Sequence, residues 1–370
     1  MQRRELLCLA GSALLGTAVP VQAQAGLGLN TLAQASGRKF GFAVAPGYAG
    51  KQPVNALLEQ HAGVITAENA MKWRNIVGAL GIPDYTQADY IVALAENLNA
   101  AVRGHVLGWH QSTPSYLHNS NADTFIAAQT KHAQTLAKRY AGRIHTWDVL
   151  NEVIEPDHQR ADGMRESVLS RLWGADNYPA FFDMARAADP AAKLAYNDYG
   201  MEQDEVWNER RRAVMLRTLD GWLQRKTPLD VLGLQAHLDV SRKFSTTKLG
   251  KFLDDVSAMG LSIHITELDV RDLQTQGSIA QRDASIAALY KDFLDVCLSH
   301  SAVEMVVLWN VTDADTWVNR WAQAQRRADG LAMRPTLFDT QGQPKPAFDA
   351  VTNSLRTAQA KFSMKEAPRV

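Results

Sequence analysis

The chain has 370 residues, of which 46% are hydrophobic and 21% charged, and its 39 basic and 39 acidic residues give a formal net charge of zero. This composition is that of a soluble globular protein with one large domain or two small ones. The balanced charge argues against a dedicated nucleic-acid binder, which usually carries a basic excess, and it is compatible with a neutral substrate such as a sugar polymer.

The first 25 residues have the pattern of an export signal. Arg3 and Arg4 form a positive start, a mostly apolar stretch runs over residues 6–19, and Ala23-Gln24-Ala25 offers a small-x-small cleavage site. The apolar stretch is too short for a comfortable membrane span. We therefore expect an exported protein, periplasmic or secreted, with no membrane attachment after signal removal. A frayed N-terminal helix is the plain alternative, and the Arg-Arg pair only hints at the twin-arginine route.

Eight short, apolar, β-rich runs follow, separated by longer segments with helical periodicity. The runs cover residues 40–45, 64–68, 102–109, 144–152, 193–197, 231–238, 262–269 and 303–310. Eight strand–helix repeats with strands apolar on both faces predict an α/β fold, a single (β/α)8 TIM barrel. An open doubly wound sheet is the alternative, and we disfavour it because no glycine-rich phosphate loop follows the first run. We expect the barrel over residues 26–355 and a polar tail over residues 356–370.

Reactive residues of such a barrel lie at the C-terminal ends of the strands, and this sequence has unusual polar and aromatic residues there. In chain order they are Glu68, Asn69 and Lys72; Arg103, His105, Trp109 and His110; Asn151 and Glu152; Asn197, Asp198 and Tyr199; Gln235 and His237; Glu267 and Asp269; and Trp309, Asn310, Asp313 and Trp317. Each alone is explained more simply as a hydrogen-bonded core group. Seven consecutive strand ends of this kind are hard to explain by packing, because buried polar groups cost stability unless they are paired.

Two of these residues, Glu152 and Glu267, are carboxylates that stand where an apolar run stops. If they converge on one cleft, one can protonate a glycosidic oxygen while the other attacks or stabilises the anomeric carbon. His237 could donate a hydrogen bond that keeps a nucleophilic Glu267 ionised, and Asp269 could orient that histidine. Trp and Tyr rings offer flat faces to sugars, and Lys, Asn, Gln and His side chains offer donors to hydroxyl groups.

The motifs resemble those of the endo-β-1,4-xylanases of glycoside hydrolase family 10, from about Phe40 to Phe348. The segments that carry the resemblance are Thr66-Ala67-Glu68-Asn69-Ala70-Met71-Lys72, Arg103-Gly104-His105, Trp109-His110, Trp147-Asp148-Val149-Leu150-Asn151-Glu152, Gln235-Ala236-His237, Ile265-Thr266-Glu267-Leu268-Asp269, and Trp309 with Thr312-Asp313 and Trp317.

The resemblance implies a retaining endo-xylanase that acts on xylan and xylo-oligosaccharides as a monomer, with no cofactor and no metal. It implies that Glu152 is the general acid/base, that Glu267 is the nucleophile, that His237 bonds the nucleophile, and that Asn151 contacts the sugar 2-hydroxyl. Other positions match sugar contacts: Glu68, Asn69, Lys72, His105, Trp109, Gln235, Trp309 and Trp317 on the glycone side, and Tyr199 on the aglycone side. A retaining enzyme holds its two carboxyl groups about 5–5.5 Å apart.

Several positions depart from the family pattern. Gly108 replaces a branched apolar residue, Asn310 replaces a glycine, and the order Gln111-Ser112 puts a glutamine contact to the second glycone sugar in doubt.

The segment 317–337 carries four arginines: Arg320, Arg326, Arg327 and Arg334. We favour a solvated loop here, and the alternative is contact with acidic side groups on a xylan chain.

Three rival functions remain. One is another barrel glycosidase, such as an endoglucanase, that uses the same glutamates. Another is a metal-dependent hydrolase using His105, His110, His237 and His264, which is disfavoured because the sequence has no H-E-x-x-H motif. The last is a non-catalytic sugar-binding protein, which would not need two opposed carboxylates.

Overall fold

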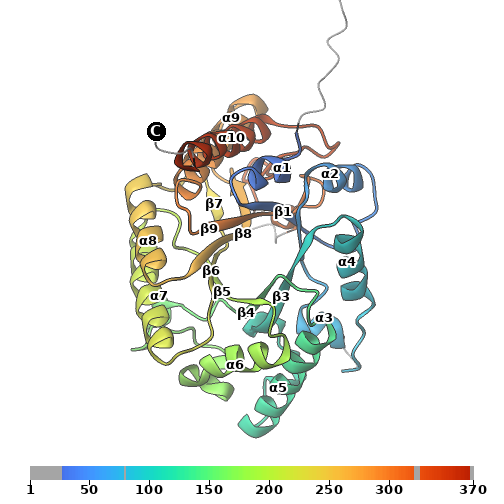
Figure 1. Cartoon of the computed structure of the whole chain (residues 1–370), viewed down its shortest axis with the longest axis vertical. Helices are drawn as coiled ribbons and strands as arrows, with labels where there is room; N and C mark the ends of the chain where they lie inside the picture. Colours follow the sequence, from blue (N-terminus) through green and yellow to red (C-terminus); the bar gives the residue numbers. More distant parts are fainter. Residues whose placement is uncertain (1–26, 79–80, 321–325, 367–370) are drawn as a thin grey trace, which may run out of the picture.

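The computed structural model describes residues 27–78, 81–320 and 326–366. Parallel strands form a closed ring at the centre of the molecule, and helices surround it (Figure 1). The strands lie in the order β6-β5-β4-β3-β2-β1-β9-β8, and β6 also pairs with β8, which closes the ring. The predicted (β/α)8 barrel is therefore confirmed. The strands are β1 (Lys39–Val44), β2 (Val64–Ala67), β3 (Ala101–Trp109), β4 (Thr146–Asn151), β5 (Lys193–Asp198), β6 (Val231–Leu234), β7 (His237–Asp239), β8 (Ser262–Arg271) and β9 (Val303–Trp309).

Seven of the eight predicted runs correspond to single strands, and the run over residues 231–238 is divided. It forms β6, and then the short β7, which pairs in parallel with β8. Between them Ala236 has a φ of 62°, a left-handed conformation that ends a strand. The expectation of one continuous strand here was wrong because composition does not show a single left-handed residue.

The helices are α1 (Leu29–Gln34), α2 (Val54–His61), α3 (Trp73–Val77), α4 (Thr86–Asn97), α5 (Ala122–Arg139), α6 (Pro179–Ala188), α7 (Val206–Gln224), α8 (Thr246–Ala258), α9 (Ile279–Cys297) and α10 (Pro346–Glu366). Local sequence fixes where several helices begin. The Asn121 side chain accepts a hydrogen bond from Thr124 N at 2.8 Å at the start of α5, and Ser278 with Gln281 forms a capping box at the start of α9.

The helix α10 packs against α9 and continues to Glu366, so most of the segment expected as a tail from residue 356 is helical. The expected signal, residues 1–25, lies outside the described residues.

Both faces of the barrel strands are buried, and their outer face packs on the helices in one large apolar core. The inside of the barrel is partly polar. Arg103 forms an ion pair with Asp148, and its Nη1 lies 2.8 Å from His264 Nδ1. Asp148 Oδ2 lies 2.9 Å from His105 Nδ1. A buried polar layer therefore supports His105, which lies in the middle of β3.

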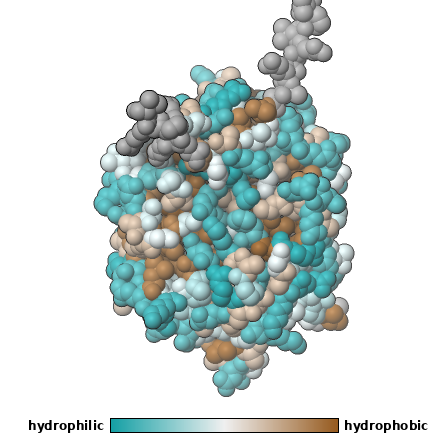
Figure 2. Space-filling model, in the orientation of Figure 1, coloured by the Kyte–Doolittle hydropathy of each residue, from teal (hydrophilic) through white to brown (hydrophobic). Residues whose placement is uncertain are grey.

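The surface seen in Figure 2 is mainly hydrophilic, with hydrophobic residues in small separate groups. Among the described residues, no helix has both the length and the apolar character needed to cross a bilayer.

Candidate active site

A cleft of about 680 Å³ lies where the barrel strands end, lined by residues from the C-terminal ends of β3, β4, β8 and β9 and from the loops that follow the strands. Of the fourteen predicted site residues, eleven line it: Lys72, His105, Trp109, Asn151, Glu152, Tyr199, Gln235, His237, Glu267, Trp309 and Trp317. The fold thus brings together residues separated by up to 245 positions in the chain. The other three, Glu68, Asn69 and Asp269, lie behind these lining residues and bond to their neighbours.

Glu152 directly follows β4, and its φ of 55° turns the chain out of the strand direction. Its carboxyl group accepts from Trp109 Nε1 at 3.0 Å and from Gln235 Nε2 at 3.1 Å. Burial raises the pKa of Glu152, the two hydrogen bonds oppose this, and the charges of Asp198 and Glu267 raise it further. The net upward shift favours a protonated acid.

Glu267 lies within β8, and its carboxyl group is the second in the cleft. Its Oε1 accepts from Asn197 Nδ2 at 2.7 Å, and its Oε2 lies 3.2 Å from His237 Nε2. Burial alone would raise the pKa of Glu267, but the hydrogen bond from His237 and the positive charges of His105, His237 and Lys72 lower it overall. One cleft therefore holds two carboxyl groups whose pKa values are shifted in opposite directions, as an acid and an anionic group require.

His237 stands between two carboxylates. Its Nδ1 lies 3.0 Å from Oδ2 of the fully buried Asp269, which also accepts from Trp317 Nε1 at 2.6 Å. Burial opposes a charge on the imidazole, yet Asp269 and Glu267 raise the pKa of His237 to about 10. The raised pKa favours the protonated imidazole, which can donate to Glu267 while Asp269 stabilises its charge.

Three amide side chains link the two glutamates. The Asn151 Oδ1 atom accepts from Asn197 Nδ2 at 2.8 Å and from Gln235 Nε2 at 3.2 Å. Because Asn197 also donates to Glu267 and Gln235 to Glu152, the amides fix both carboxyl groups in one network. Asn197 was not among the predicted site residues. Its position at the end of the fifth run was the available signal.

Lys72 lies among aromatic rings on one side of the cleft. Its Nζ lies 4.9 Å from the ring centre of Trp109 and 5.8 Å from that of Trp309, and it donates to Asn69 Oδ1 at 3.0 Å. Burial lowers the pKa of Lys72, against the charges of Glu267, Glu68 and Glu152. This side combines flat apolar faces with a cationic donor, which suits a sugar ring.

The opposite side of the cleft is built by the loops after β4, β5 and β7. Arg165 donates to the Tyr199 hydroxyl at 2.7 Å, and Arg211 lies 4.2 Å from the centre of that ring. Beyond Tyr199, the guanidinium of Arg242 stacks 5.3 Å from the Trp207 ring centre. Trp207 and Arg242 line the cleft, as do Gln111, Gly200, Glu202, Gln203, Asn208 and Arg271. Apart from Gln111, whose sugar contact was in doubt, sequence reasoning missed these residues. Trp207 and Asn208 lie at the start of α7, Arg271 ends β8 and the others lie in loops, so the pattern of polar strand ends did not mark them.

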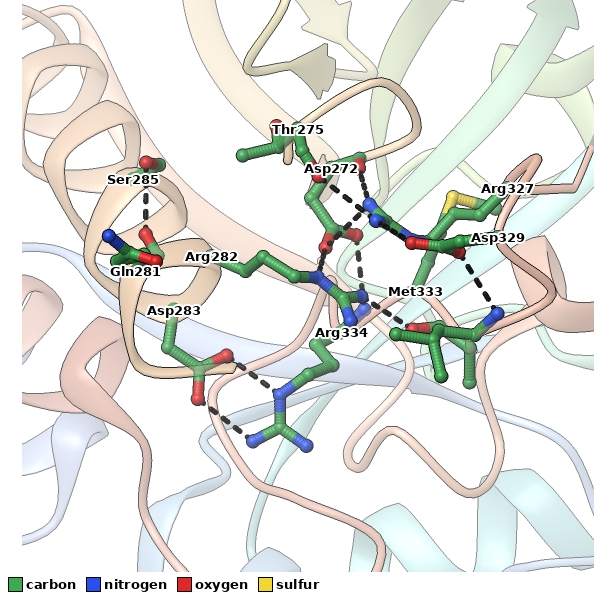
Figure 3. Close-up of polar contacts among 12 residues, drawn as sticks. Asp272, Thr275, Gln281, Arg282, Asp283, Ser285, Arg327, Asp329, Met333 and Arg334 are labelled. Atoms are coloured by element: carbon green, nitrogen blue, oxygen red, sulfur yellow. Dashed lines mark hydrogen bonds and ion pairs between the residues drawn. The ribbon is translucent and has the colours of Figure 1, made fainter. Parts of the chain in front are cut away.

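Two arginines of the segment 317–337, Arg327 and Arg334, have structural contacts (Figure 3). Arg327 is 5% exposed and bonds to Asp272 and Asp329, while Arg334 forms a paired contact with Asp283 at 2.7 and 2.9 Å. For Arg327 the favoured interpretation of a solvated loop was wrong, because its side chain is buried and pairs with Asp272, which directly follows β8. Arg320, by contrast, donates to Glu68 Oε1 at 2.9 Å and is about half exposed.

The four histidines of the metal-hydrolase alternative are not gathered in one place. His105 and His237 line the cleft, whereas His264 lines a hollow at the N-terminal end of the strands with Lys39 and Glu304. Within residues 27–78, 81–320 and 326–366, no group of three or more His, Cys, Asp or Glu side chains is arranged to hold a metal ion.

Comparisons with known proteins show the family to which the chain belongs. A model of glycosyl hydrolase family 10 matches residues 28–354. Endo-1,4-beta-xylanase 3 of Hypocrea jecorina is 30% identical over 318 residues, covering 86% of this chain and 82% of that protein. An endo-1,4-beta-xylanase of Geobacillus stearothermophilus is 29% identical, covering 80% of this chain and 90% of the relative. The crystal structure of xylanase 10B from Thermotoga petrophila in complex with xylobiose superposes with a TM-score of 0.80 at 26% identity, covering 90% of this chain and 98% of the other.

Proposed function

The chain belongs to glycosyl hydrolase family 10, and from this membership we propose that its cleft binds xylan and cleaves internal β-1,4-xylosidic bonds with retention of configuration. The observation that carries the proposal is the pair Glu152 and Glu267, whose carboxyl groups line one cleft with pKa values shifted apart. The resemblance found in the sequence led to the same family from the motifs around these two residues.

The reaction has two displacement steps. Glu152, protonated, gives its proton to the glycosidic oxygen while Glu267, ionised, attacks the anomeric carbon, so the aglycone leaves and a glycosyl-enzyme ester forms. Glu152 then takes a proton from a water molecule, whose oxygen attacks the same carbon and releases Glu267. A raised pKa of Glu152 and a lowered pKa of Glu267 support these assignments.

His237 and Asp269 support the nucleophile. The cation on His237 donates to Glu267 and stabilises its ionised form, and Asp269 stabilises that cation. We assign Asn151 to the 2-hydroxyl of the sugar at the cleavage point, since its amide stands between the two glutamates. A hydrogen bond to this hydroxyl that strengthens in the transition state lowers the barrier.

We assign the remaining predicted residues to sugar binding. Lys72, His105, Trp109, Gln235, Trp309 and Trp317 would contact the glycone sugars, Glu68 and Asn69 would support them, and Tyr199 would face the aglycone. Xylose lacks the hydroxymethyl group of glucose, so a glycone floor near Lys72 and Trp317 would exclude glucose by a steric clash.

The test is hydrolysis of plain xylan against carboxymethyl cellulose, with viscosity and reducing ends measured together. We expect an early fall in viscosity on xylan, the sign of endo cleavage, and little reaction on the cellulose derivative. Glu267→Gln should lower the rate at least about a thousandfold. Equal activity on both polymers would favour the endoglucanase alternative, and full activity of Glu267→Gln would remove the catalytic assignment.

We also propose that the chain is exported and works as a monomer, without nucleic acid or membrane partners. The pattern of residues 1–25 supports export, and the small, separate hydrophobic groups on the face in Figure 2 support a monomer. The N-terminal sequence of the mature protein would test cleavage before Gly26, and light scattering would test the mass in solution.

A further inference from the structure

Asn310 has a backbone conformation that favours glycine. It directly follows β9, its φ is 86°, and it is fully buried. A residue with a Cβ atom is strained in this region, and it persists where its surroundings hold it there. The side chain of Asn310 therefore has contacts that offset the strain.

Those contacts reach two separate parts of the cleft wall. Asn310 Nδ2 donates to Glu68 Oε2 at 2.7 Å, and Asn310 Oδ1 accepts from the Trp317 backbone N–H at 3.0 Å. Glu68 follows β2, whereas Asn310 follows β9, and β1 lies between these strands in the sheet. One amide thus joins two strand ends across the end of a third.

The connection continues from Glu68 to Lys72. Asn69 Nδ2 donates to Glu68 Oε1 at 2.9 Å, and Lys72 Nζ donates to Asn69 Oδ1 at 3.0 Å. A chain of hydrogen bonds therefore runs from the backbone of Trp317 to the ammonium group of Lys72, and both of these residues line the cleft. Arg320 also donates to Glu68 Oε1, so the charge of Glu68 keeps a cationic partner if Asn310 is changed.

We propose that Asn310 is a positioning residue for the glycone half of the cleft, which it sets by tying Trp317 to Lys72 through Glu68 and Asn69. The inference rests on the proposed function, which places the glycone sugars on this side. Glu152 and Glu267 take their hydrogen bonds from Trp109, Gln235, Asn197 and His237, and Asn310 bonds to none of these groups. The two ends of the chain meet the catalytic groups through other atoms, since the Trp317 indole donates to Asp269 and the charge of Lys72 lowers the pKa of Glu267. The Asn310 side chain therefore acts chiefly on sugar binding, with a small effect on the chemical step.

The variant Asn310→Gly tests this, because glycine accepts the φ of 86° and removes only the side chain. With an aryl β-xylobioside, which fills two glycone positions, we expect KM to rise about tenfold, the factor that about 1.4 kcal/mol supplies, and kcat to stay within about twofold. With an aryl β-xyloside, which fills one position, kcat/KM should change much less. An unchanged KM on the xylobioside, or equal losses on both substrates, would overturn the proposal.

A matched control is Asn99→Gly. Asn99 also has a positive φ, 52°, but it is exposed and precedes β3 at the other end of the barrel. Asn99→Gly should leave the kinetics on both substrates as in the wild type. If the wild type hydrolyses neither substrate, the proposed function fails; if it hydrolyses both and the two glycine variants behave alike, only the role of Asn310 fails.

A second variant, Asn310→Asp, distinguishes the hydrogen bond to Glu68 from the hydrogen bond to the Trp317 backbone. The carboxylate can still accept from Trp317, but it faces the carboxylate of Glu68 without a donor. We expect KM on the xylobioside to rise at neutral pH and to recover as the pH falls, because protonation of either carboxyl group restores a donor. A KM defect that does not depend on pH would contradict the role given to the Asn310–Glu68 bond.

Discussion

His237 Nε2 lies 3.2 Å from Glu267 Oε2 and donates to it as a cation. Its charge is maintained by Asp269, which lies 3.0 Å from the other ring nitrogen. The ionisation of Glu267 therefore depends on Asp269, a residue that does not line the cleft.

The first prediction concerns Asp269→Asn. Without the aspartate charge the pKa of His237 falls from about 10, Glu267 loses part of its cationic partner, and the pKa of Glu267 rises. Because Glu267 must be ionised, activity is lost as the pH falls through its pKa. The acidic limb of kcat/KM should thus move to higher pH, by about one unit. An acidic limb at the wild-type position would show that Asp269 has no such effect.

The basic limb should report Glu152. This residue must be protonated, so activity is lost as the pH rises through its raised pKa. Trp109 Nε1 donates to the carboxyl group and favours its charged form, so Trp109→Phe should raise the pKa of Glu152 further. We expect the basic limb to move to higher pH by a few tenths of a unit, whatever the change in overall rate. A downward shift would contradict the acid role.

Glu152→Ala should distinguish substrates by their leaving groups. An activated aryl group departs with little protonation, so its cleavage should fall far less than that of xylan, where the loss should reach at least about a hundredfold. Added azide should restore turnover of the aryl substrate by attacking the glycosyl-enzyme in place of activated water, which gives the β-glycosyl azide. Equal losses on both substrates, or an α-azide product, would argue against the assignment.

Arg327→Gln should affect stability and leave substrate choice unchanged. Arg327 is an almost fully buried partner of Asp272, and removing one member of a buried ion pair costs about 3 kcal/mol. Arg217→Gln, an exposed change on α7, should cost less than about 0.5 kcal/mol. Urea unfolding would measure both variants. A changed ratio of activity on glucuronic-acid-bearing and plain xylan would favour the alternative weighed from the sequence, a contact with acidic side groups on xylan.

The sequence allowed prediction of the barrel and of the residues gathered at the C-terminal ends of its strands. Apolar runs that recur between helical segments are the direct result of strands buried on both faces, and residues at the ends of parallel strands meet at one edge. This is why Glu152 and Glu267, far apart in the chain, could be expected in one cleft.

Other features depend on single backbone conformations or on contacts between loops, which a sequence pattern does not show. The left-handed Ala236 divides the sixth run and brings both Gln235 and His237 to the cleft. Trp207 reaches the cleft from the start of α7 and Arg242 from the loop after β7, and Arg327 is buried because it pairs with Asp272 in the folded chain. Charge and composition gave no signal for any of these.

The most direct test of the account is the anomeric form of the first product. Plain xylan would be hydrolysed with enough enzyme to outrun mutarotation, and the reducing-end protons would be followed by NMR from the earliest times. If Glu267 forms a covalent intermediate that water then opens, the β-anomer appears first and the α-anomer grows only by mutarotation. Initial appearance of the α-anomer would mean direct attack by water and would contradict the double displacement by Glu152 and Glu267.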